Sequence, residues 1–198
     1  DNPVTYLSNN KLNTLNPYLG SIVPFYHLNL EFFKKKLNIF YPNENSPNLN
    51  DIIEFFFAEN LSLKSWTNEH KKDHTLAFIL ICDFLNIEVN IVDKYEEANL
   101  VFCSLDQYLD YCGCSTYPYE LDVFSTLDNK MFIFYSGLMP EDETSKGSHW
   151  FQIFLHQILH CFGLVHPEED TGLSKIMPGS SQNHNGLFSM NTIFSTLM

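Results

Sequence analysis

Residues 147–166 read GSHWFQIFLHQILHCFGLVH, and this stretch decides the fold. Its apolar residues recur at helical spacing, and Gly147 with Ser148 is suited to open a helix. Gly163 is suited to the left-handed turn that ends one. The sequence therefore predicts a helix over residues 150–162 with a sharp exit from it.

Three histidines lie on this helix and just after it. Four residues make slightly more than one helical turn, so His156 and His160 should project from the same face. The glycine that follows the helix lets His166 return towards the same point, which leaves a fourth tetrahedral position for water. The spacing predicts a Zn²⁺ site of the open kind that catalysis needs.

Gln157 follows the first of these histidines directly. That position is turned by about 100° from the ligand, so it borders the metal-bound water and is the place for a general base. An amide takes up no proton at neutral pH, so we expect hydrolysis to be slower by about 10²–10⁴-fold or more. Two explanations stay open: a deliberate Glu→Gln change that inactivates an enzyme, and a natural pseudoenzyme that keeps the site for binding.

The other five histidines lack this spacing. A histidine without partners at ligand spacing is more often a hydrogen-bonded core or surface side chain than a ligand. We predict this ordinary role for His27, His70, His74, His149 and His184.

Upstream of the helix the sequence gives strand and helix signals in turn. Apolar runs with alternation or turn residues at their ends predict strands, which lie at residues 37–41, 87–93, 98–104 and 131–135. Thr67 is a capping residue followed by charges and then by apolar residues at helical recurrence, which predicts a helix to about residue 86.

Two upstream segments are less clear. DIIEFFFAENL, residues 51–61, is short enough to be either a helix or a buried strand, and its three consecutive phenylalanines are predicted to be core. Residues 104–122 form a long predicted loop that holds Cys112 and Cys114, which are too close for an easy disulfide with each other.

Length and charge limit the classes of protein. The 198 residues fit a single domain, with residues 1–36 as a lead segment and residues 37–198 as the main body. A net charge of −13, with only 11 Lys and Arg residues, argues against nucleic acid or an anionic membrane as partner. No apolar run is long enough to predict a membrane span, and five cysteines do not suggest a disulfide framework.

The run HQILHCFGLVHP resembles the metzincin signature HExxHxxGxxH and departs from it at Gln157. The segments ANLVF, STYPY and NKMFIFYSG precede it in the order of the strands of serralysin-like and matrixin-like enzymes. The resemblance implies an α+β catalytic domain over residues 37–198. That domain would have a twisted mixed β-sheet, a backing helix, an active-site helix and a C-terminal helix.

The same resemblance implies further site residues. A methionine turn beneath the zinc would use Met177, 11 residues after His166, with Met198 as the alternative. Substrate would bind extended along an edge strand near residues 115–119, which makes Ser115, Thr116 and Tyr117 candidate substrate-binding residues. A secreted monomer is expected.

The sequence thus leads to one principal hypothesis and two alternatives. The first is a zinc-dependent endopeptidase that cleaves protein or peptide substrates with metal-activated water, inactivated here by Gln157. The second is a pseudoprotease that binds zinc and a peptide or protein without turnover. The third is a metal with a purely structural role.

Overall fold

The computed structural model describes a little over half of the chain. The described residues are 36–46, 49–57, 61–107, 113–115, 130–140, 143–162, 164, 166, 180–181 and 184–185. Residues 29–161 form one compact unit, and residues 1–28 together with 162–198 form another, so each is described by itself. In the second unit, β6 (Ser180–Ser181) pairs antiparallel with β7 (His184–Asn185).

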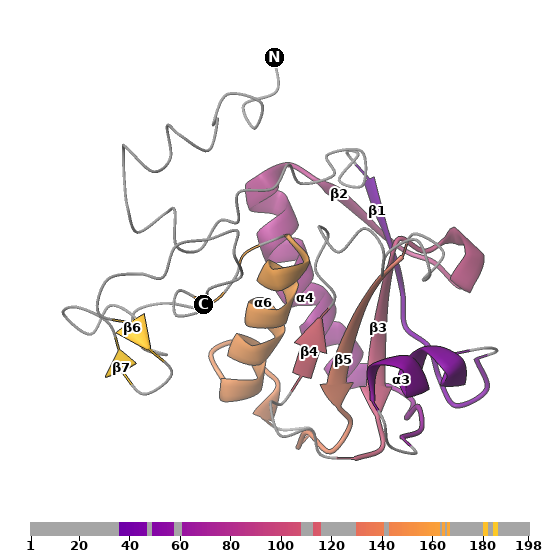
Figure 1. The fold of residues 1–198 in the computed structure, drawn as a ribbon. Coiled ribbons are helices and arrows are strands. Elements are labelled where there is room, and N and C mark those ends of the chain that lie inside the picture. The colour runs from indigo at the N-terminus through magenta and orange to yellow at the C-terminus, as the bar shows by residue number, and fades with distance from the viewer. Residues whose placement is uncertain are drawn as a thin grey trace. The chain divides into compact units, whose positions relative to one another are not determined.

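The unit of residues 29–161 is built on a five-stranded sheet (Figure 1). The strand order is β2-β1-β3-β5-β4. Four strands are parallel: β1 (Lys36–Phe40), β2 (Glu88–Ile91), β3 (Leu100–Leu105) and β5 (Met131–Ser136). The short β4 (Gly113–Ser115) lies at one edge and runs antiparallel to β5. The predicted mixed sheet and its four upstream strands are confirmed, and β4 falls inside the predicted loop.

Within the described residues, three α-helices and one 3₁₀ turn accompany the sheet. They are α3 (Asn50–Phe56), α4 (Asn68–Leu85), α6 (His149–Cys161) and η2 (Tyr95–Glu97). The predicted capping residue is confirmed, because the Thr67 side chain accepts a hydrogen bond from the backbone N–H of His70 at 3.2 Å. Asn86 ends α4 in the left-handed conformation, with φ 56°.

The central strands are buried on both faces, as a sheet between two helical layers requires. On one face, two residues of α4 lie against Phe102: the ring centroid of His74 is 4.3 Å from that of Phe102, and the ring centroid of Phe78 is 5.5 Å from it. Phe154 of α6 lies against Tyr135 at 5.3 Å. Figure 1 shows α4 and α6 side by side across this face.

The opposite face of the sheet packs on α3 and the segments that flank it. Because successive strand residues point to opposite faces, the neighbours of Phe102 and Tyr135 turn this way. The resulting core comprises Leu49, Ile53, Leu61, Leu63, Ala98, Val101, Cys103, Leu105, Phe132 and Phe134. Both faces together explain why β3 and β5 read as continuous apolar runs.

The segment with three consecutive phenylalanines forms the helix α3, and its prediction as core is wrong in part. Phe56 and Phe57 pack against Phe134, with ring centroids 5.2 Å and 5.1 Å away, whereas Phe55 is 60% exposed. Successive helical residues are about 100° apart, so three in a row cannot all face one core.

His74 is a core histidine, as predicted, and is fully buried. Its Nδ1 shares a hydrogen bond of 3.0 Å with the Tyr41 hydroxyl, and its Nε2 shares one of 3.0 Å with the Tyr135 hydroxyl. The Tyr41 hydroxyl also lies 2.9 Å from the Thr75 hydroxyl. The imidazole touches Phe154 as well, with ring centroids 5.0 Å apart, so this network ties the sheet, α4 and α6 together.

The structure describes only some of the other residues about which the sequence makes a prediction. Among the remaining histidines with a predicted ordinary role, His70 is buried on α4 and His149 is exposed at the start of α6. The side chains of His27 and His184 lie outside the described residues, as do Gly163 and the predicted C-terminal helix. The division into residues 1–36 and 37–198 stays a prediction.

The buried network predicts a specific pH dependence of stability. Burial lowers the pKa of His74 from 6.5 to about 3. Between these values the unfolded chain binds a proton that the native protein does not. The free energy of unfolding should therefore fall below pH 6.5, by up to about 1.4 kcal/mol per pH unit from this residue.

His74→Gln keeps hydrogen-bonding capacity for the two tyrosines. It should lower the number of protons that the chain takes up on unfolding by up to one, and the pH dependence of the free energy of unfolding should weaken accordingly. Urea unfolding between neutral pH and about pH 4.5, with a chelator present, measures it. His149→Gln is the matched control, because it removes an exposed imidazole and should leave the slope unchanged. Equal slopes in the His74 variant and the wild type would contradict the prediction.

Gly137 follows β5 and has no space for a side chain. Its N–H donates to the Leu105 carbonyl at 2.6 Å, and its own carbonyl accepts from Lys64 Nζ at 2.6 Å. A Cβ here would overlap the Leu105 oxygen and lie 2.6 Å from the Ser104 hydroxyl. Gly137→Ala should lower the free energy of unfolding by about 1–3 kcal/mol.

Chemical denaturation of Gly137→Ala tests this close approach. Ser145→Ala, at an exposed serine, should stay within about 0.5 kcal/mol of the wild type. If Gly137→Ala lowers the free energy of unfolding no more than Ser145→Ala does, the backbone around residue 137 can move aside at little energetic cost.

Candidate metal centre

The helix α6 is held against the sheet by one apolar face. Its buried apolar residues are Trp150, Phe151, Phe154, Ile158 and Cys161. The helix contacts α4, β5 and the edge strand β4. Its position is therefore fixed by core packing along its length, and the histidines near its last turn are carried on a rigid element.

Two of the three predicted ligands lie on consecutive turns of this helix. The Nε2 atoms of His156 and His160 are 3.0 Å apart, and the two rings are nearly perpendicular at 82°. His160 is 3% exposed, while His156 is half-buried. The shared face that the four-residue spacing predicts is confirmed.

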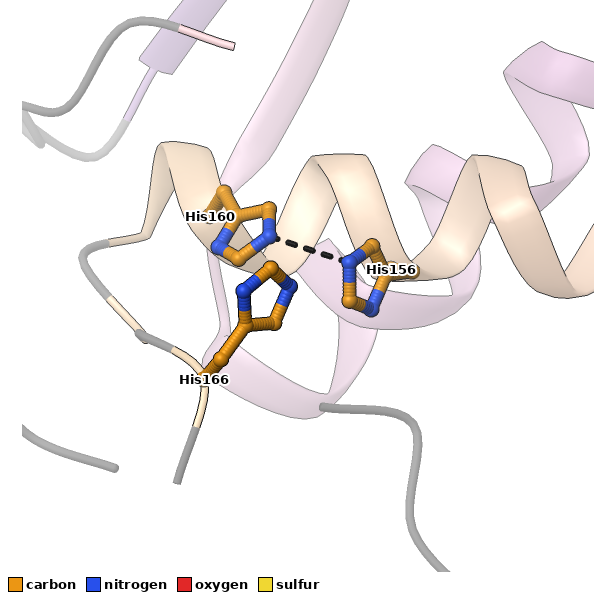
Figure 2. Close-up of side chains that lie close together, drawn as sticks. All are labelled: His156, His160 and His166. Carbon is orange, nitrogen blue, oxygen red and sulfur yellow. Dashed lines mark hydrogen bonds between the residues drawn. The ribbon is translucent and has the colours of Figure 1, made fainter. Parts of the chain in front are cut away.

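The third predicted ligand follows the helix closely in sequence. Figure 2 shows the ring of His166 turned towards the rings of His156 and His160. One nitrogen from each of the three imidazoles lies within 4.8 Å of the other two. The three histidines thus converge, as the sequence predicts, and this group could hold a metal ion.

The donor set and its spacing fit a first-row metal ion. Zn–N bonds of about 2.0–2.1 Å at tetrahedral angles place ligand nitrogens about 3.3–3.4 Å apart. The 3.0 Å between His156 Nε2 and His160 Nε2 is close to that value, and all three ligand nitrogens lie within 4.8 Å of one another. Three imidazoles suit Zn²⁺, and they also suit Cu²⁺ and Ni²⁺.

Cysteine does not extend this ligand set. Cys161 adjoins His160 in sequence, but it is buried, and its burial raises the pKa of the thiol well above the ordinary value. A neutral thiol is a poor metal ligand. In the part of the chain that the structure describes, the three histidines are the one group of His, Cys, Asp or Glu with this convergence.

Gln157 lies between the two helical ligands and is 5% exposed. With glutamine here, the HExxH motif is not present. The amide is neutral at every accessible pH and can only exchange hydrogen bonds. The described residues therefore offer a metal-binding group beside a side chain that does not act as a general base.

The remaining predicted site residues are only partly described. Ser115 ends β4, which forms the edge of the sheet beside α6. Thr116, Tyr117, Met177 and Met198 lie outside the described residues, so their roles stay predictions. None of the described helices is long and apolar enough to cross a membrane.

The convergence of the histidines predicts metal binding that depends on each of them. Purified protein should hold close to one equivalent of Zn²⁺ by elemental analysis. His160→Ala should weaken binding by at least about 100-fold, more than the loss of an outer hydrogen-bond partner usually costs. Competition with a chromophoric chelator measures the affinity.

The matched control is His149→Ala, at the exposed first residue of the same helix, which should leave the affinity unchanged. Less than about half an equivalent of zinc in correctly folded wild-type protein would contradict the three-histidine site.

The chain matches no protein-family model and no curated protein sequence. Its resemblance to metzincins rests on the spacing of His156, His160, Gly163 and His166 and on the order of the segments before them.

Proposed function

We propose that this chain binds Zn²⁺ through His156, His160 and His166 and has the architecture of a metzincin-type endopeptidase, with Gln157 in place of the general base. The observation that carries the proposal is the convergence of three imidazoles at the end of a buried helix. Three ligands leave one position of a tetrahedral ion open, which is the arrangement of catalytic rather than structural zinc.

The surrounding fold supports this proposal. The spacing HxxxHxxGxxH is specific among metal-binding patterns, and its helix packs on a mixed sheet as the resemblance implies. The backing helix α4 lies beside α6 on the same face of the sheet. Together these features favour a peptidase scaffold over an isolated structural metal site.

A substrate of this site would be an extended protein or peptide chain. β4 is an edge strand, and among the described strands it pairs with β5 alone. An edge strand offers backbone groups to which a peptide adds as a further strand. Since β4 also contacts α6, a peptide added here would run beside the helix that carries His156 and His160.

The three histidines and Gln157 would have different roles at this site. The histidines would hold the ion as neutral imidazoles, and zinc, when bound, would polarise a scissile carbonyl and lower the pKa of its water to about 7. Gln157 can orient that water by hydrogen bonding. It cannot take the proton that the water must lose, so the proposed site binds substrate and turns it over slowly, if at all.

This gap supports a second candidate function, a pseudoprotease that retains zinc and peptide binding without turnover. The specific observation in its favour is Gln157 itself, which leaves the ligand set intact and removes only the base. Both candidates use the same metal ligands and the same Gln157. They differ in whether the scaffold becomes catalytic when a carboxylate is restored.

Gln157→Glu separates the two candidates. If the scaffold is catalytic, this variant should cleave a fluorogenic peptide library at least about 10²–10⁴-fold faster than the wild type, because a carboxylate at this position accepts the proton of the attacking water. A chelator should abolish the cleavage, and added Zn²⁺ should restore it.

Gln152→Glu makes the same change of charge on the same helix, five residues earlier, and should stay inactive. If Gln157→Glu holds a full equivalent of zinc but cleaves no peptide, the pseudoprotease is favoured. If Gln157→Glu neither cleaves peptide nor binds zinc, the result counts against the metal site itself.

A further inference from the structure

The outer face of α4 carries a row of apolar side chains that the core does not use. Leu76, Ile79 and Leu80 are 38%, 38% and 40% exposed, and Phe84 is 90% exposed. Their spacing of three, four and eight residues from the first puts them on one side of the helix. We call these four residues the outer row of α4.

The other side of α4 already supplies its share of the core. Ala77, Phe78 and Cys82 are buried there together with His74. A helix on the surface of a globular protein normally has one apolar stripe and a polar outer face. α4 instead has apolar residues on both sides, and a contiguous exposed row of this kind marks an interaction site more often than a single exposed residue does.

Two further exposed apolar residues lie near the end of the helix and on the neighbouring strand. Leu85 is 42% exposed in the last turn, and Ile91 is 47% exposed on β2, which α4 contacts. β2 is the strand opposite β4 at the other edge of the sheet, where β1 is its single described neighbour. An edge strand and an apolar helix face thus lie together, far from the strand that the proposed substrate would use.

The charges around the outer row are mainly negative. Asp83 lies between Leu80 and Phe84, and Glu88 opens β2. Lys72, one turn before Leu76, lies 3.4 Å from Glu69, which offsets its charge. The last turn of α4 contains no basic residue, so the partial negative charge of the helix end adds to these carboxylates. The nearby Lys36 lies 3.7 Å from Glu88 and offsets one of them.

The negative charge near the outer row favours some binding partners over others. A second copy would bring the same acidic helix end and a net charge of −13, and an anionic membrane would also be repelled. We propose that the outer row of α4 is a docking surface for a basic amphipathic segment of another protein. Its apolar side chains would cover Leu80 and Phe84, and its Lys or Arg residues would face Asp83 and the C-terminal end of α4.

A defined probe tests this surface. A synthetic amphipathic helix of leucine and lysine should bind the full-length chain saturably in fluorescence anisotropy, and the affinity should fall as salt is added. The same peptide with glutamate in place of lysine should not bind. The double variant Leu80→Ser, Phe84→Ser should bind the lysine peptide at least about tenfold more weakly.

Phe55→Ser is the matched control, because Phe55 is 60% exposed on α3, which packs on the opposite face of the sheet. It should bind the peptide as the wild type does. Circular dichroism should show all variants folded, since the replaced side chains are exposed.

Three outcomes would overturn the proposal. Equal binding by the double variant and the wild type would mean that the lysine peptide is attracted by net charge alone. Self-association that the double variant abolishes in sedimentation would assign the surface to a second copy. Failure of Phe84→Cys to react with a maleimide beyond the wild-type background would mean that the chain itself covers the outer row.

Discussion

The contact between Phe154 of α6 and Tyr135 of β5, with ring centroids 5.3 Å apart, holds the helix that carries the candidate metal ligands. Tyr135 is itself fixed by the hydrogen bond of its hydroxyl to His74 at 3.0 Å. Burial raises the pKa of this hydroxyl well above its ordinary value, so it stays a neutral hydrogen-bonding group. The position of His156 and His160 therefore depends on a polar network in the core as well as on apolar packing.

The part of this arrangement that follows from local sequence could be predicted. The cap at Thr67, the helix that carries His156 and His160, and the buried strands all depend on residues close together in the chain. The convergence of His166 followed from the same local spacing. These features need only helical periodicity and capping chemistry, which act over a few residues.

The rest could not be predicted, because it depends on contacts between distant segments. The two tyrosines that bind His74 lie 33 and 61 residues from it, and no local pattern selects them as partners. The exposure of Phe55 depended on the register of α3 against the sheet, which three identical neighbours cannot specify. The apolar residues of α4 recur at helical spacing in the sequence, but which side of the helix faces the core depends on its packing, and Leu76, Ile79, Leu80 and Phe84 lie on the exposed side.

The metal group separates two properties that a peptidase normally combines. Zinc affinity depends on the number and convergence of ligands, and a neutral amide beside them changes neither. Turnover depends in addition on a base that accepts a proton at the right moment. Since Gln157 is buried on the same helix as His156 and His160, an exchange between carboxylate and amide at this position would alter the chemistry without requiring the ligands to move. Under the proposed function, a site of this kind would hold a peptide and a metal ion together for longer than an active enzyme would.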